Sequence, residues 1–130
     1  PMGDITAFAE KYVQAMAGNT GMSVAITDRD RVIAAAGNEK KHVQGKQISK
    51  ELNDIMDERK SIVAKAGDKA YITLVPDYEC WYEAVSPIIC AGDVLGAVAM
   101  FTTQKGYEFG ENEKCLVRVA ADFLGKHMDS

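Results

Sequence analysis

The chain has 130 residues, of which 47% are hydrophobic and 26% charged, with a net charge of −4, a composition typical of one globular domain. A negative charge of this size excludes a domain that holds nucleic acid by its own electrostatic attraction, and no apolar stretch reaches the roughly 20 residues of a membrane-spanning helix. We therefore expect a single domain over residues 1–130, with no membrane segment and no DNA contact of its own.

The first elements expected along the chain are a helix and a hairpin. Asp4 has the side chain of a helix N-cap, and the apolar pattern behind it runs at helical spacing as far as Gly18. The residues that carry this pattern are Ile5, Phe8, Tyr12 and Met16. Residues 22–27 and 31–36 are short apolar runs on either side of Asp28-Arg29-Asp30, which predicts two strands joined by a tight turn.

A polar segment and a second helix follow, and then three strands. Periodicity is lost from residue 37 to 47, which predicts an internal loop, and Ser49 has the side chain of an N-cap for a helix. Runs at 71–75, 81–87 and 94–103 predict strands. Both faces of the last run are apolar, so we place it at the centre of a sheet that is covered on both sides.

The last element expected is a long helix with Glu111 and Glu113 in its first turn and Lys126 and His127 near its end, where these charges suit the helix dipole. Hairpin-linked strands between helices predict an α+β fold, because such strands pair antiparallel. We expect a central antiparallel sheet of five or six strands. The N- and C-terminal helices pack on one face, and loops plus the central helix cover the other. This is the architecture of sensory GAF domains and the related PAS domains.

Four blocks of the sequence carry a resemblance that extends over essentially the whole chain. They are Met22–Asp30, Ile48–Leu52, Ser86–Ile89 together with Gly92–Val98, and Ala120–Met128. In this order and at these spacings they closely resemble the C-terminal GAF-like domain of the stage V sporulation protein T family of transcription regulators.

The resemblance implies a cytoplasmic domain of a sporulation regulator that senses an unidentified small molecule and assembles into a homodimer or tetramer. It also implies that DNA is bound only through a separate N-terminal domain, which is absent here. The start at Pro1-Met2-Gly3 fits a piece of a longer protein. The resemblance implies no cofactor, and the family has no ligand motif that maps onto individual residues.

The polar segment contains one candidate anion site. Lys40, Lys41, His42 and Lys46 lie in a stretch without acidic residues from 40 to 50. That stretch leads to a helix N-terminus, whose free amides favour anions such as a nucleotide or a carboxylate. The alternative is a solvated loop, which is the more frequent meaning of a charge run.

A second candidate site lies where the second of the three strands begins. Tyr78, Cys80, Trp81 and Glu83 would line a pocket between the sheet and its loops, where aromatic walls suit a small planar ligand and Glu83 suits its amine. Successive side chains of a strand point to opposite faces, which puts Trp81 and Glu83 on one face of the sheet and Tyr82 on the other. These three side chains therefore cannot all line one pocket. The alternative is ordinary core packing of large side chains.

The three cysteines, Cys80, Cys90 and Cys115, leave one enzymatic alternative open. Some GAF domains reduce free methionine sulfoxide with a cysteine just before a strand, where Cys80 lies. That chemistry needs a low-pKa thiolate and a resolving thiol, and neither other cysteine is placed to resolve Cys80. An odd number of cysteines without metal-ligand spacing fits a reducing cytosol. We therefore expect no catalytic residue and no metal site.

The terminal helices carry more apolar surface than one sheet face covers. The side chains concerned are Phe8, Tyr12, Met16, Phe123 and Leu124. Surplus apolar surface of this kind packs against a second copy, so we expect these residues at an interface between copies. A module that only assembles, without any ligand, is the alternative function.

Overall fold

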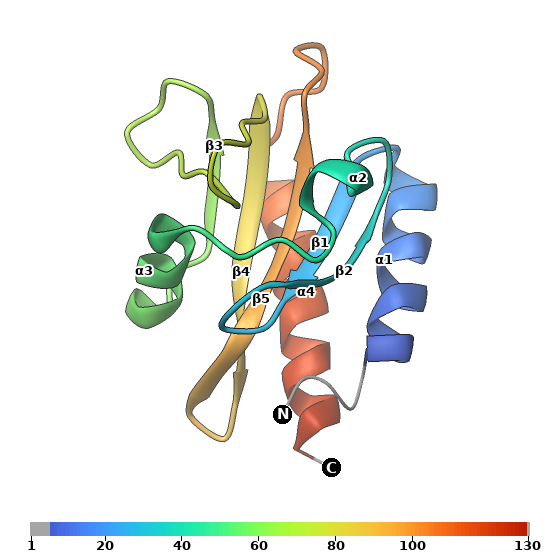
Figure 1. Ribbon diagram of the computed structural model, residues 1–130, viewed down its shortest axis with the longest axis vertical. Helices are drawn as coiled ribbons and strands as arrows, with labels where there is room; N and C mark the ends of the chain where they lie inside the picture. The colour runs from blue at the N-terminus through green and yellow to red at the C-terminus, as the bar shows by residue number, and fades with distance from the viewer. Residues whose placement is uncertain (1–5, 130) are drawn as a thin grey trace.

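The computed structural model describes residues 6–129, and its centre is a five-stranded antiparallel sheet in the order β2-β1-β5-β4-β3 (Figure 1). The elements along the chain are α1 (Thr6–Thr20), β1 (Ser23–Thr27), β2 (Val32–Ala36), α2 (Lys40–Val43), α3 (Lys50–Glu58), β3 (Ile62–Lys65), β4 (Tyr82–Cys90), β5 (Asp93–Thr102) and α4 (Glu111–Met128). This arrangement confirms the predicted α+β fold with a helix at each end.

Strand β5 lies between β1 and β4, as its two apolar faces predicted. Phe101 is paired with Ser23 of β1 on one side and with Glu83 of β4 on the other. Residues 96–102 are all buried. The strand is therefore covered on both faces, and β4 beside it has seven buried residues in succession, 82–88.

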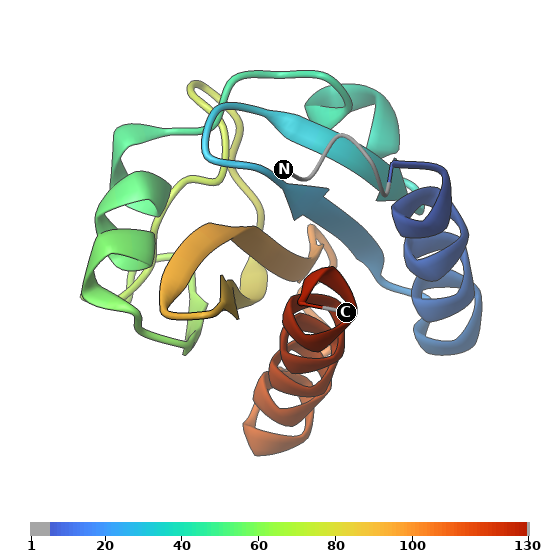
Figure 2. The same ribbon diagram turned by 90° about the horizontal axis from the view of Figure 1, so that it is seen from below.

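The two faces of the sheet belong to two separate clusters of buried side chains. The terminal helices cover one face, with Ala9 and Val13 from α1 and Val117, Ala120 and Leu124 from α4. The central helix and the irregular chain cover the other face, with Val43, Leu52, Met56, Leu74 and Val75. Figure 2 shows α1 and α4 on the same side of the sheet. The predicted distribution of helices over the two faces is confirmed.

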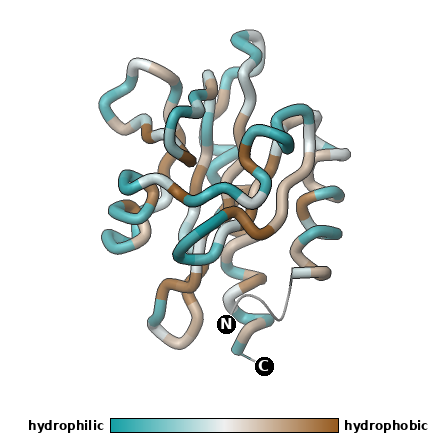
Figure 3. Tube along the Cα trace, in the orientation of Figure 1, coloured by the Kyte–Doolittle hydropathy of each residue, from teal (hydrophilic) through white to brown (hydrophobic). Residues whose placement is uncertain are grey.

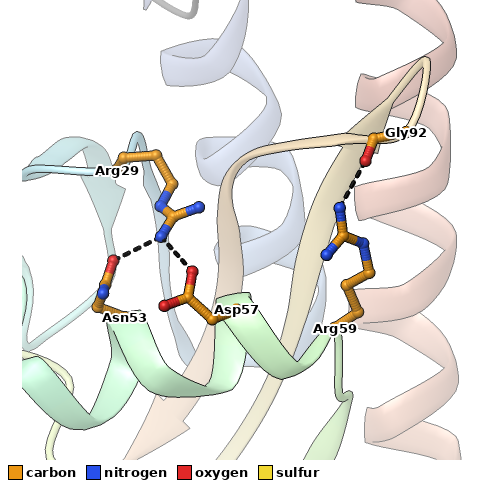
Figure 4. A network of polar contacts seen from close by, with 5 residues as sticks. All are labelled: Arg29, Asn53, Asp57, Arg59 and Gly92. Carbon is orange, nitrogen blue, oxygen red and sulfur yellow. Dashed lines mark hydrogen bonds and ion pairs between the residues drawn. The ribbon is translucent and has the colours of Figure 1, made fainter.

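Two arginines tie α3 to the neighbouring turns (Figure 4). Arg29, in the β1–β2 turn, donates to Asn53 Oδ1 and Asp57 Oδ1 of α3, each at 2.7 Å. Arg59, which follows α3 in the left-handed conformation, donates to the carbonyl oxygen of Gly92 at 2.6 Å. Of these contacts only Arg29–Asp57 is an ion pair, and exposed ion pairs contribute little stability.

The strand predicted at 71–75 is wrong, because this segment is irregular and its backbone pairs outside the sheet. Ser49, the predicted N-cap of α3, donates from its N–H to the Leu74 carbonyl at 2.9 Å and from its hydroxyl to the Thr73 carbonyl at 2.5 Å. The apolar residues of the segment cover the sheet instead of extending it. The missing strand is β3, a short edge strand whose only buried residue is Ala64, so it shows no apolar alternation.

Smaller differences concern the ends of elements. The loop predicted at 37–47 contains the one-turn helix α2, which Val43 anchors in the core. Helix α1 continues past Gly18. The expected N-cap Asp4 and the apolar Ile5 lie outside the described residues.

Hydrophobic residues concentrate in the strands and hydrophilic ones in the turns and the outer parts of the helices (Figure 3). Among residues 6–129, no helix is both long and apolar enough to span a membrane. This finding agrees with the sequence-based expectation.

Helix α4 lies unusually close to β4 at Gly125. A Cβ added to this residue would approach the carbonyl oxygen of Ile89 far more closely than van der Waals contact allows. Because the obstacle is backbone, no side-chain rotation relieves it. Only glycine therefore allows α4 to pack at this distance from the sheet.

We expect Gly125→Ala to lower the free energy of unfolding by roughly 1–3 kcal/mol, the usual cost of overpacking a core. The matched control is Gly18→Ala in α1, where an added Cβ meets nothing within 4 Å. There alanine should add roughly 0.5–1 kcal/mol through its better helix propensity. Urea unfolding of both variants measures the difference. Equal effects in the two helices would show that α4 does not depend on the close approach.

Candidate functional site

Glu83 is the only carboxylic acid among the buried residues of the described chain, and it is 0% exposed. It is the second residue of β4, beside Ala64 of β3 and Phe101 of β5. Its neighbour Tyr82 stacks on Phe109 at 5.6 Å, within the cluster on the α4 side of the sheet. Glu83 instead binds residues of the chain between β3 and β4, so the predicted alternation of these two side chains is confirmed.

The carboxyl of Glu83 has few partners. The backbone N–H of Ile72 donates to Oε2 at 2.8 Å, and the Cys80 thiol lies 4.0 Å from Oε1. No ion pair in the described part of the chain includes Glu83. Burial raises the pKa of this carboxyl to about 8, against the lowering effect of the Ile72 N–H. At pH 7 the group is therefore mostly the neutral acid.

Cys80 and Tyr71 complete the cluster around Glu83. The Tyr71 hydroxyl accepts from the Cys80 N–H at 3.0 Å and donates to the Cys80 carbonyl at 3.2 Å. Burial, and next the nearby carboxyl of Glu83, raise the pKa of the Cys80 thiol to about 12. Two acids therefore stay protonated side by side, and neither supplies a charge to the site.

A second set of contacts joins the same irregular chain to α2. Tyr78 donates its hydroxyl to Glu39 Oε1 at 2.7 Å, and its ring stacks on His42 at 5.8 Å between centroids. The edge of the Tyr78 ring also meets Phe101 at 6.0 Å. Tyr78 thus lies between α2 and the sheet, close to the Glu83 cluster.

The structure therefore brings together part of each predicted site. Cys80 and Glu83 are in contact, and His42 of the basic stretch meets Tyr78 of the aromatic one. Trp81 is placed elsewhere, with Lys105 Nζ 4.5 Å from its ring centroid. The other predicted anion-binding residues, Lys40, Lys41 and Lys46, are exposed.

Sequence reasoning missed two members of the site, Tyr71 and Glu39. Tyr71 was assigned to a strand, because its segment has the apolar content of one. Glu39 lies in the polar stretch just before the predicted basic site, where no pattern singles it out. Only the path of the chain over the sheet brings these residues to Cys80 and Tyr78.

The cysteines do not form a pair around this site. Cys90 ends β4, eight residues of extended chain beyond Tyr82, or roughly 26 Å. Cys115 is exposed on α4, the helix that covers the opposite face. No thiol among the described residues is therefore placed to resolve Cys80.

The face of the sheet covered by α1 and α4 carries an aromatic group in place of a polar cluster. Phe8, Tyr12, Phe123 and His127 form an aromatic group between α1 and α4, in which Phe8 and His127 stack at 4.8 Å. Leu124 is fully buried in the core beneath α4, so it offers no surface to a partner in this conformation.

Three large apolar side chains on α4 are exposed to solvent: Leu116 by 43%, Val119 by 59% and Phe123 by 49%. Spacings of three and four residues place them in one row along the helix. Val119 borders a groove of about 510 Å³ between α4 and β4, and Leu116 borders a hollow of about 290 Å³ beside Tyr12 and Met16 of α1.

Residues 4–129 match the family described as "Stage V sporulation protein T C-terminal, transcription factor". The chain is 35% identical over 129 residues to stage V sporulation protein T of Bacillus subtilis (strain 168), a match that covers 99% of this chain and 71% of that protein. Both findings agree with the resemblance inferred from the four sequence blocks.

Several solved GAF-domain structures share the fold at low sequence identity. The GAF domain of an Acinetobacter phosphoenolpyruvate-protein phosphotransferase has a TM-score of 0.76 at 12% identity, over 94% of this chain and 80% of that one. The cofactor-binding GAF domain of the nutrient sensor CodY from Clostridium difficile has 0.67 at 14%, over 92% and 83%. A type II free methionine-R-sulfoxide reductase from Thermoplasma acidophilum has 0.68 at 15%, over 94% and 93%. At these identities the likeness shows the fold alone.

We expect Glu83→Gln to stabilise the protein increasingly as pH rises. The folded pKa of Glu83 is raised to about 8 from an ordinary 4.5, so the folded state holds a proton that the unfolded state has lost. Wild-type stability should therefore fall between about pH 4.5 and pH 8 and level off above. Glutamine, which matches the neutral acid in shape, removes this loss and should gain roughly 2–4 kcal/mol at pH 8.

Denaturant unfolding of both proteins from pH 4 to pH 9 measures this difference. Glu79→Gln, at an exposed position four residues earlier, is the control and should follow the wild-type profile. Parallel profiles for wild type and Glu83→Gln would show that Glu83 has an ordinary pKa.

Proposed function

Because the chain belongs to the family of the C-terminal domain of stage V sporulation protein T, a family of transcription factors, we propose that it senses a small molecule and assembles with copies of itself. Both events act on an N-terminal DNA-binding domain to which it is joined in a cytoplasmic regulator. The observation that carries the proposal is Glu83, a fully buried carboxyl for which the described residues provide no counter-ion.

The Glu83 cluster has the character of a binding site. Burying a polar group without full pairing costs stability, and groups with strongly shifted pKa values gather where function requires them. The surroundings are otherwise apolar, with one carboxyl, one thiol and one phenol meeting at the same point. CodY, whose GAF domain binds a cofactor, has the same fold and supports the proposal by analogy.

Assembly is supported by the exposed row Leu116, Val119 and Phe123. Apolar side chains aligned on one helix face lose contact with water when a second copy packs against them. The self-complementary contact of a twofold homodimer needs only this one patch. A tetramer follows if the full regulator also pairs through another domain.

One strand connects the two proposed sites. β4 carries Glu83 near its beginning, under the irregular chain, and Ile89 near its end, against Gly125 of α4. A ligand that changes the position of β4 at one end would alter the packing of α4 at the other. Ligand binding would in this way favour one arrangement of the terminal helices, and of the domain attached to them, over another.

The structural features favour a sensor over a cysteine-dependent reductase, although one fold relative is a reductase. A nucleophilic cysteine works as the thiolate, whereas burial and Glu83 hold the pKa of Cys80 at about 12. Cys90 and Cys115 are not positioned to take part. The site therefore suits binding rather than thiol chemistry.

The sensing proposal predicts that the chain retains a small molecule when purified gently. Native mass spectrometry should give complexes heavier than the polypeptides they contain, and denaturation should release the added mass. An oligomer that carries nothing in any preparation would indicate the alternative, a module that only assembles. Ligand added back at a hundredfold excess over its Kd should raise the free energy of unfolding by about 2.7 kcal/mol.

The assembly proposal predicts that Val119→Glu weakens self-association at least tenfold, because a carboxylate would be buried in the apolar row. Asn38→Glu is the matched control, since it adds the same charge at an exposed turn beside α2. Sedimentation equilibrium over a range of concentrations measures the dissociation constants. Equal constants for both variants would place the interface elsewhere, and a wild-type monomer at all concentrations would exclude this interface.

A further inference from the structure

We propose that the ligand sensed by this domain carries an ammonium group on a small apolar body, and that the Glu83 carboxylate binds the ammonium beneath the chain segment 66–81. This inference rests on the proposed sensing function and adds to it the chemical class of the ligand.

The weakly bonded acceptor is Oε1 of Glu83. Oε2 already accepts from the Ile72 N–H at 2.8 Å, whereas the nearest partner of Oε1 is the Cys80 thiol at 4.0 Å. A carboxylate can accept several hydrogen bonds, so most of its capacity is unused. The hydroxyl of Tyr71 is already paired with the N–H and the carbonyl of Cys80, so Glu83 is the acceptor available to a new donor.

The chemistry around Glu83 favours an ammonium ion over a metal ion. A protein holds a divalent metal with several carboxylate, imidazole or thiolate ligands. In residues 6–129 no group of three such side chains comes together. A single carboxylate with one free oxygen suits a single charged N–H donor.

The remainder of the surroundings is apolar and would contact the body of the ligand. Phe101 lies beside Glu83 on β5, and it belongs to the apolar cluster that covers this face of the sheet and includes buried aliphatic residues from three other parts of the chain. These residues are Leu52, Met56, Leu74, Val75 and Val85. An apolar body gains from burial among them, at about 25 cal/mol per Å² of surface removed from water.

Access to Glu83 requires the segment 66–81 to move, because the carboxyl is fully buried. Residues 71–81 form neither helix nor strand. Tyr78 holds the segment to α2 through a hydrogen bond to Glu39 and a stacking contact with His42. Ser49 also holds its middle part, by donating to the Thr73 and Leu74 carbonyls. All of these contacts lie outside the sheet, so exposing Glu83 requires a local opening of the segment and no strand has to leave the sheet.

Binding would also exchange a proton. At pH 7 Glu83 is mostly the neutral acid, with a pKa of about 8, and it binds an ammonium as the carboxylate. Its proton therefore passes to the buffer as the ammonium arrives, and the charges balance. The ionisable groups facing Glu83 are Cys80 and Tyr71 from the irregular segment, with Glu39 farther off near α2. Burial raises the pKa of both Cys80 and Tyr71, so neither of these two groups ionises near neutral pH.

Three probes of the same shape test the class of ligand: isoamylamine, isoamyl alcohol and isovalerate. Isothermal titration calorimetry on the wild-type chain at pH 7 should show isoamylamine binding at least tenfold more tightly than the other two. Titrations in phosphate and in Tris, which differ in ionisation enthalpy, should report nearly one proton released per amine bound. The affinity should rise up to tenfold per pH unit between pH 6 and pH 8.

Glu83→Gln should weaken isoamylamine binding at least tenfold, and the control Glu79→Gln should not. Because the glutamine variant is expected to be more stable than wild type, loss of binding would not reflect unfolding. Tyr78→Phe, which removes the hydrogen bond to Glu39, should bind the amine more tightly, because less free energy is needed to open the segment.

The results separate this inference from the proposed function. If the wild type does not bind isoamylamine, or binds the alcohol as tightly, the inference is wrong. The same holds if native mass spectrometry releases a molecule without a basic nitrogen, although sensing itself would then be supported. If no probe binds and no molecule is released, both proposals fail.

Discussion

The fold depends on the burial of β4 and β5 on both faces. The terminal helices cover one face and the central helix with irregular chain covers the other, so the buried apolar side chains of these strands enter one of two clusters. Burial on both faces also requires the backbones of neighbouring elements to approach closely. Gly125 brings α4 against the Ile89 carbonyl, and Gly96 lies against the Thr27 carbonyl. In such a layer a carboxyl is the least expected side chain, and this makes Glu83 the most informative residue of the molecule.

Strands β4 and β5, buried on both faces, also separate two different regions of the domain. The face under the irregular chain is enclosed and contains the buried polar cluster, whereas the face under the terminal helices ends in the exposed row of α4. β4 belongs to both, and its two ends lie in different environments. The proposed coupling between ligand and assembly would therefore need no long chain of contacts, only a change in the position of one buried strand.

The sequence predicted those features that depend on local pattern. The first hairpin, the Ser49 cap and the central position of β5 follow from turn residues, a capping side chain and two apolar faces. The segment 71–75 was misassigned because a run that covers a sheet has the same apolar content as a run that joins it. The Glu83 cluster was predicted in part: proximity along the chain suggested Cys80, but the approach of Tyr71 depends on the path of the loop.

The protonation of the cluster supports the proposed binding function over thiol catalysis, a choice that the fold leaves open because it occurs in a nutrient sensor and in a reductase. A thiol catalyst needs a positive or polar environment that stabilises its thiolate. Here Cys80 has a buried acid as its neighbour, and the two groups oppose each other's ionisation. The stable state of the cluster near neutral pH is therefore uncharged, and the proposed ligand would bring a charge of the opposite sign to the carboxylate. A site arranged in this way can recognise a cation, whereas it suppresses the nucleophile that a reductase requires.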